Sequence, residues 1–247
     1  MNASTRYIST TRKLASLICA LFGSVALTAA DDTAAADKTA AVKHIERGVI
    51  LERQDKHEEA EAAFREAVTL DPTNGRAHFN LGMMLKMQDR AADAEKAFRT
   101  AAELLPENAQ AHFQLGYTLG KLGKFEDAVK QLQRALDLDP LYPSALYELG
   151  LAMEEKGKHK EAEEAYRLAI EREPKNPKPY FALGTLFATQ EKYVEAAVCF
   201  QRAVELDPRN AEAHQSLGEA LKADNKIPEA EAAFERARQL NGDPKTF

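Results

Sequence analysis

The sequence has very little cysteine and none of the short motifs that mark common enzyme classes. Its two cysteines are Cys19 and Cys199. Because we expect Cys19 to be removed with an N-terminal segment, the remaining chain cannot form an intramolecular disulfide. A glycine-rich phosphate loop, a Gly-x-Ser-x-Gly elbow and a Cys-x-x-Cys pair are all missing. The sequence therefore predicts a protein that is not an enzyme, and we interpret Cys199 as a small buried apolar residue.

Clusters of basic residues are also missing. The chain has 33 Lys and Arg against 39 Asp and Glu, a formal net charge of −6. Residues 1–30 contain three of the basic residues and no acid, so the rest of the chain has 30 basic and 39 acidic side chains, a net charge of −9. Neutralising phosphates requires a basic face, so this composition argues against nucleic acid as a partner.

The N-terminal 30 residues have the layout of a secretory signal peptide. A basic, hydroxyl-rich start is followed by an apolar run over residues 14–27 and by small residues that end at Ala30. We expect cleavage there, a disordered polar lead-in over residues 31–40, and a periplasmic or secreted protein. The alternatives are an uncleaved membrane anchor and an organelle transit peptide. A lipoprotein signal is disfavoured, since Ile18 rather than a small residue precedes Cys19.

The rest of the chain is a tandem repeat with a period of 34 residues. The six units cover residues 41–244 without an insertion, as 41–74, 75–108, 109–142, 143–176, 177–210 and 211–244. One glycine marks each unit, at Gly48, Gly82, Gly116, Gly150, Gly184 and Gly218, and an alanine follows twelve residues later in each. A fixed period of this length indicates a solenoid of supersecondary units.

Each unit contains two amphipathic helical patterns separated by a short polar turn. In the second unit the apolar residues Phe79, Leu81 and Leu85 have helical spacing, and Ala94 and Phe98 begin a second such series. Proline ends the second helix in five units. A glycine inside a helix costs roughly 1 kcal/mol relative to alanine, so its recurrence predicts a close crossing of the two helices, with the recurrent alanines of the second helix facing it.

These residues resemble the pattern of tetratricopeptide repeat (TPR) proteins. The fifth unit matches it with Tyr180, Leu183, Gly184, Phe187, Ala196, Phe200, Ala203 and Pro208. The resemblance implies an all-α fold, a right-handed TPR superhelix or α-solenoid of helix-turn-helix repeats. It also implies that the first helix of each repeat lines a concave groove and the second forms the convex back.

The histidines and carboxylates do not predict a metal site or a cofactor. Four histidines share one repeat position, His44, His78, His112 and His214, and are a whole number of repeats apart rather than three to five residues apart. Carboxylates such as Glu58, Glu59 and Glu61 lie on the expected second helix among Lys and Arg, and we interpret them as a solvated outer face. No desolvated carboxylate pair for acid-base catalysis is predicted.

The expected groove is the best candidate for a binding site. In the TPR family the second, fifth and ninth positions of each repeat line it. In repeats two to five, the large apolar residues at the fifth and ninth positions are Phe79, Met83, Phe113, Tyr117, Tyr147, Leu151 and Phe181. Exposed apolar patches tend to mark interaction sites, although ordinary helix packing also explains part of this pattern. The lysine and asparagine of the family's carboxylate clamp for chaperone tails are missing, so such an adaptor is disfavoured.

The sequence thus predicts an exported, non-enzymatic adaptor or scaffold, a monomer or weak homo-oligomer, whose groove binds a peptide or helix of a partner protein during assembly of an envelope complex. One alternative is a holdase that shields apolar segments of several clients. Another is an organelle-targeted TPR assembly factor. A TPR array identifies a binding mode but not the bound protein.

Overall fold

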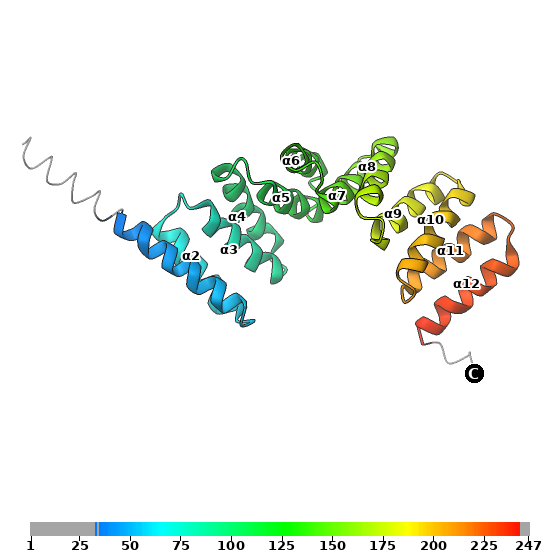
Figure 1. The fold of residues 1–247 in the computed structure, drawn as a ribbon, viewed down its shortest axis with the longest axis horizontal. Coiled ribbons are helices and arrows are strands. Elements are labelled where there is room, and N and C mark those ends of the chain that lie inside the picture. The colour runs from blue at the N-terminus through cyan, green and yellow to red at the C-terminus, as the bar shows by residue number, and fades with distance from the viewer. Residues whose placement is uncertain (1–32, 34, 243–247) are drawn as a thin grey trace, which may run out of the picture. The chain divides into compact units, whose positions relative to one another are not determined.

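We analysed a computed structural model of the chain, which describes residue 33 and residues 35–242. These residues form twelve helices and no strand (Figure 1). The proposed signal peptide lies outside the described residues. A first helix spans residues 35–52, and it is followed by α2 (His57–Leu70), α3 (Gly75–Met87), α4 (Ala91–Leu104), α5 (Ala109–Lys121), α6 (Phe125–Leu138), α7 (Pro143–Glu155), α8 (His159–Arg172), α9 (Pro177–Thr189), α10 (Tyr193–Leu206), α11 (Ala211–Ala223) and α12 (Ile227–Leu240).

The chain divides into two units, one up to Asp89 and one from Arg90, and each is described by itself. In the first unit α2 packs against α3. In the second unit the helices pack in hairpins, α5 with α6, α7 with α8, α9 with α10 and α11 with α12, and each hairpin packs against the next. The first helices of these hairpins, α5, α7, α9 and α11, also contact one another in sequence. None of the described helices is long and apolar enough to span a bilayer.

Turn and capping residues explain why the helices begin and end where they do. The turn inside each of the six repeats contains one residue with φ between 58° and 72°: Asp55, Asp89, Gly123, Gly157, Glu191 and Asn225. Four first helices begin after an asparagine whose side chain accepts a hydrogen bond from a backbone N–H of the first turn: Asn74, Asn108, Asn176 and Asn210. Such caps satisfy amides that the helix itself cannot pair.

The repeat glycines make room for a large side chain of the hairpin's second helix. A Cβ added to Gly48 would lie 2.5 Å from the Phe64 ring, and one added to Gly116 would lie 2.7 Å from Leu132 Cγ. A Cβ added to Gly150 would likewise lie too close to the Tyr166 ring. The expectation of a close crossing at glycine is therefore confirmed. The facing residue is a ring or a leucine rather than the predicted alanine.

The structure differs from the sequence-based expectation in two further places. Residues 35–40, expected to be a disordered lead-in, are helical and continue into the first repeat helix, which fits the helix propensity of their alanines. Glu61, expected on a solvated outer face, is buried. It forms an ion pair with Arg65 at 2.6 Å and accepts a hydrogen bond from Gln88 at 2.7 Å. Glu58 and Glu59 are exposed, as predicted.

The recurrent histidines have a structural role. Nε2 of His78, His112 and His214 each lies 3.0 to 3.2 Å from the carbonyl oxygen of the proline six residues earlier. These contacts tie the start of a first helix to the turn that precedes it. Within the described residues, no three His, Cys, Asp or Glu side chains are grouped so that they could hold a metal ion.

Candidate partner-binding surface

The candidate surface is the face that the adjoining first helices form, which we call the first-helix face. In the second unit Phe113 and Tyr117 lie on α5, Tyr147 and Leu151 on α7, and Phe181 on α9. All five side chains are half-buried. Because α5, α7 and α9 contact one another in sequence, these residues at matching repeat positions lie on neighbouring helices. In the first unit Phe79 and Met83 are also half-buried, both on α3.

The rings at the fifth repeat position serve partly as scaffold. The Tyr147 ring centroid lies 6.1 Å from that of Tyr166, and Phe181 lies 5.5 Å from Phe200, a residue of the hairpin's second helix in both cases. Tyr166 is fully buried, and its hydroxyl donates a hydrogen bond to Glu154 at 2.8 Å. Burial and this carboxylate raise the pKa of Tyr166 far above its ordinary value. One side of each fifth-position ring is therefore fixed by packing while the other reaches the surface.

Charged groups accompany the apolar side chains on this face. The Lys121 ammonium lies 5.6 Å from the centroid of the Tyr117 ring. Glu148, next to Tyr147 on α7, is half-buried, and burial raises the pKa of its carboxyl, while Lys121 and Lys178 act in the opposite direction. Lys178 lies in the first turn of α9.

The character of the first-helix face changes toward the C-terminal end of the second unit. A hollow of about 290 Å³ lies among α9, α10 and α11, and Thr185, Thr189, Ser216 and Glu219 contribute to its lining. Tyr193, Phe200 and two alanines line the rest of it. At the ninth repeat position Thr185 and Glu219 stand where α5 and α7 have Tyr117 and Leu151.

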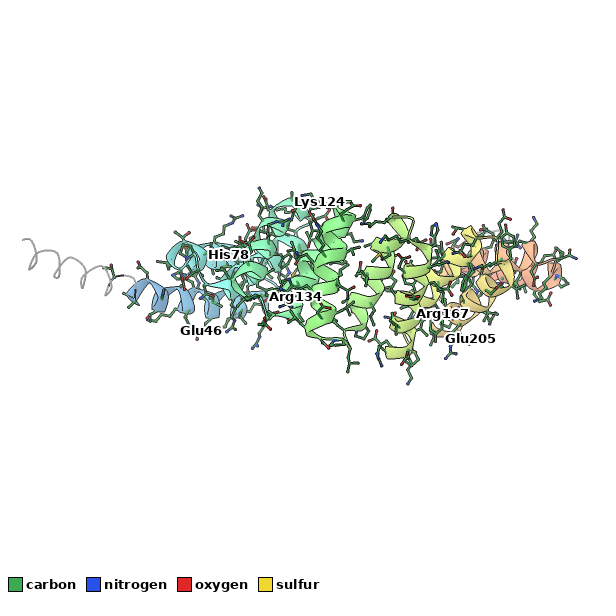
Figure 2. All side chains as sticks on the ribbon, turned by 90° about the horizontal axis from the view of Figure 1, so that it is seen from above. Glu46, His78, Lys124, Arg134, Arg167 and Glu205 are labelled. Carbon is green, nitrogen blue, oxygen red and sulfur yellow. The ribbon has the colours of Figure 1, made fainter. Side chains whose placement is uncertain are left out.

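A larger hollow, of about 780 Å³, lies beside α8 and α10, the second helices of two hairpins, and Tyr180 and Leu183 of α9 also line it. We call it the outer hollow. Residues of α8 and α10 line it together with Leu217 and Leu221 of α11, and two of its lining residues, Arg167 and Glu205, are labelled in Figure 2. The exposed fractions of Val194 and Val198 on its α10 side are 51% and 66%.

Sequence reasoning missed the outer hollow, although the repeat contained a signal for it. Val194 and Val198 occupy the eighteenth and twenty-second repeat positions. No other repeat has a branched apolar residue at either position. The eighteenth position holds Glu58, Ala92, Glu126, Lys160 and Pro228, and the twenty-second holds Ala62, Lys96, Lys130, Glu164 and Ala232. Cys199 also lines this hollow, half-buried, and burial raises the pKa of its thiol to about 11. A thiol with a raised pKa is a poor nucleophile at neutral pH.

Hairpins of antiparallel helices repeated every 34 residues define an α-solenoid repeat protein. Residues 9–246 match the family described as Cilia and flagella-associated protein 70 C-terminal domain, and the chain belongs to this tetratricopeptide repeat family. The predicted membership of the TPR class and the predicted all-α fold of helix-turn-helix repeats are therefore confirmed.

Several solved structures share the fold. PilF of Pseudomonas aeruginosa aligns with a TM-score of 0.70 and 20% identity over 85% of this chain and 96% of its own. MamA aligns with a TM-score of 0.62 and 26% identity over 67% of this chain and 96% of its own. YrrB, described as a TPR protein with an unusual peptide-binding site, aligns with a TM-score of 0.64 and 24% identity over 70% and 89%. The comparison with curated proteins found no match.

Proposed function

We propose that this protein is a non-enzymatic scaffold that holds a peptide or helical segment of a partner protein on its first-helix face. The observation that carries the proposal is the row of half-buried apolar side chains at matching positions of α5, α7 and α9. TPR arrays present extended binding surfaces built from successive repeats, and a peptide-binding site is named for the similarly folded YrrB. Aromatic anchors in such surfaces commonly contribute 2 kcal/mol or more each to binding.

We further propose that the protein is exported and acts during assembly of an envelope complex. The layout of residues 1–30 supports export. Mass spectrometry of the protein from its source cell should find a mature chain that begins near Asp31. An intact Met1 terminus in a cytoplasmic fraction would remove both the signal peptide and the location.

Partner number distinguishes the scaffold from its main alternative, a holdase for several clients. The full chain, purified from its source cell after mild cross-linking, should bring down one partner in a fixed stoichiometry. Truncating Tyr117 and Leu151 to serine should remove that partner. Lys130→Ala on the exposed side of α6 is the matched control and should retain it. Many unrelated clients in substoichiometric amounts would favour the holdase instead.

A further inference from the structure

One half-buried carboxylate on the first-helix face, Glu148, differs from the two buried glutamates among the described residues. Buried Glu61 and Glu95 each have partners: Arg65 lies 2.6 Å from Glu61, and Lys124 lies 2.6 Å from Glu95. Glu148 is half-buried, yet within the described part of the chain it forms no hydrogen bond and no ion pair. A carboxylate that loses solvent without gaining donors is destabilised in its charged form.

The surroundings of Glu148 place it among the first helices. It lies on α7, which contacts both α5 and α9. Lys121 near the end of α5 and Lys178 at the start of α9 act on its charge. Neither lysine forms an ion pair with it in the described residues, and the Lys121 ammonium lies instead over the Tyr117 ring. Burial, and after it the charges of Glu148 and Glu154, raises the pKa of the adjacent Tyr147 phenol.

The same repeat position holds a second polar group without a partner. Asn80 is the equivalent of Glu148 on α3, and its buried Nδ2 makes no hydrogen bond within the described residues. Buried polar groups in folded proteins are nearly always satisfied. The Asn80 Nδ2 atom has almost no exposed surface, so it marks the repeat position as polar but does not itself reach a bound chain. Of the two groups, half-buried Glu148 is the one that a bound chain can contact.

We propose that Glu148 is a specificity-determining residue of the first-helix face and pairs with a lysine or arginine side chain of the bound segment. The inference rests on the proposed function, since it names the ligand chemistry of the same surface. A carboxylate is an acceptor-only group with room for several donors, and charge-assisted hydrogen bonds are the strongest it can form. The recognised segment therefore has a basic residue between apolar side chains that cover Tyr147 and Leu151.

A randomised dodecapeptide library displayed on phage, selected against the full chain, tests this inference. Wild-type protein should enrich peptides in which Lys or Arg stands among apolar residues. Glu148→Gln should keep the apolar enrichment and lose the basic one. Glu164→Gln removes the same single charge at an exposed site on α8. It controls for the lower acidity of the whole chain and should still enrich basic peptides as wild type does.

A peptide from the wild-type selection then gives the size of the effect. Replacing its basic residue with methionine should weaken binding to wild type on the order of tenfold and should not change binding to Glu148→Gln. Apolar enrichment without Lys or Arg, enrichment of Asp or Glu, or a basic preference that survives in Glu148→Gln would overturn the inference and leave the proposed function intact. No enrichment with wild type would contradict the proposed function itself, and the inference with it.

Discussion

Gly116 and Gly120 lie one turn apart on α5 but differ in what a side chain would meet. A Cβ on Gly116 would lie 2.7 Å from Leu132 Cγ and 3.1 Å from the backbone nitrogen of Leu132, whereas a Cβ on Gly120 would meet nothing within 4 Å. Glycine recurs at the first position because of a neighbour on another helix. At the second position nothing in the fold requires it.

Alanine substitution at the two sites should have opposite effects on stability. Gly120→Ala should raise the free energy of unfolding by about 1 kcal/mol through helix propensity. Gly116→Ala gains the same propensity but overpacks the hairpin, and overpacking costs typically 1 to 3 kcal/mol, so we expect a net loss. Urea unfolding followed by circular dichroism measures both. Equal stabilities of the two variants would show that the close approach has no energetic consequence.

The 34-residue repeat predicted where the helix-crossing glycines lie, but not which side chain packs against each of them. A period of 34 places Gly116 opposite the second helix, yet it cannot say whether an alanine or Leu132 fills the space. The same limit explains Glu61, because a polar residue on an outer helix is buried when a side chain such as Gln88 reaches it from the next repeat. Contacts between repeats depend on side-chain direction, which spacing does not give.

At the scale of the element, the sequence predicts the helices closely because each one carries its own start and stop signals. The second helices α4 and α12 both begin at the seventeenth residue of their repeats, directly after the polar turn. Asn108 accepts a hydrogen bond from Ala111 N–H at 2.9 Å and so caps α5. At the start of α7 the equivalent residue is Tyr142, which makes no side-chain cap. Its ring lies tilted against the Phe113 ring, with the two centroids 4.7 Å apart.

Removing the Asn108 cap should destabilise the protein. Asn108→Ala leaves first-turn amides without their acceptor, and losses of this kind are about 1 kcal/mol. Gln110→Ala, at an exposed residue of the same first turn, is the control and should be neutral. Differential scanning calorimetry of the two variants tests this. A melting temperature for Asn108→Ala equal to that of the control would mean that solvent replaces the cap fully.

Helix α4 is joined to the start of α6 by an ion pair whose effect should depend on pH. Hydrogen bonding to Lys124, with help from Arg99, lowers the pKa of buried Glu95 below its ordinary value of 4.5. Because the folded-state pKa is depressed, the stabilisation is complete above the unfolded-state pKa and disappears as the pH falls through the folded-state pKa. Wild type should therefore lose stability between about pH 5 and about pH 3 more steeply than Glu95→Gln.

Chemical unfolding at several pH values measures this slope. Glu103→Gln, an exposed position on the same helix, should leave the slope as it is in wild type. If Glu95→Gln and wild type lose stability in parallel over this range, the link between α4 and α6 does not contribute to the pH dependence.

At the scale of the whole chain, the sequence predicted the repeat class and the apolar side chains of the first-helix face. It did not predict the outer hollow. The positions of Val194 and Val198 hold charged residues, alanine or proline in the other five repeats. This pattern predicted that the second helices present a solvated outer face. A single departing repeat is visible only when each position is compared through all six units. The exposed valines make the outer hollow a second candidate docking site beside the first-helix face.

A cross-linking footprint on the two faces tests the central claim most directly. A photo-reactive phenylalanine analogue replaces one residue at a time. Two sites, Tyr117 and Leu151, lie on the first-helix face, and two, Lys130 and Val198, lie on the second helices α6 and α10. We expect illumination in the source cell to join one and the same partner to the first two sites and not to the last two. A partner captured through Val198 alone, with the first-helix sites unlabelled in correctly folded protein, would contradict it.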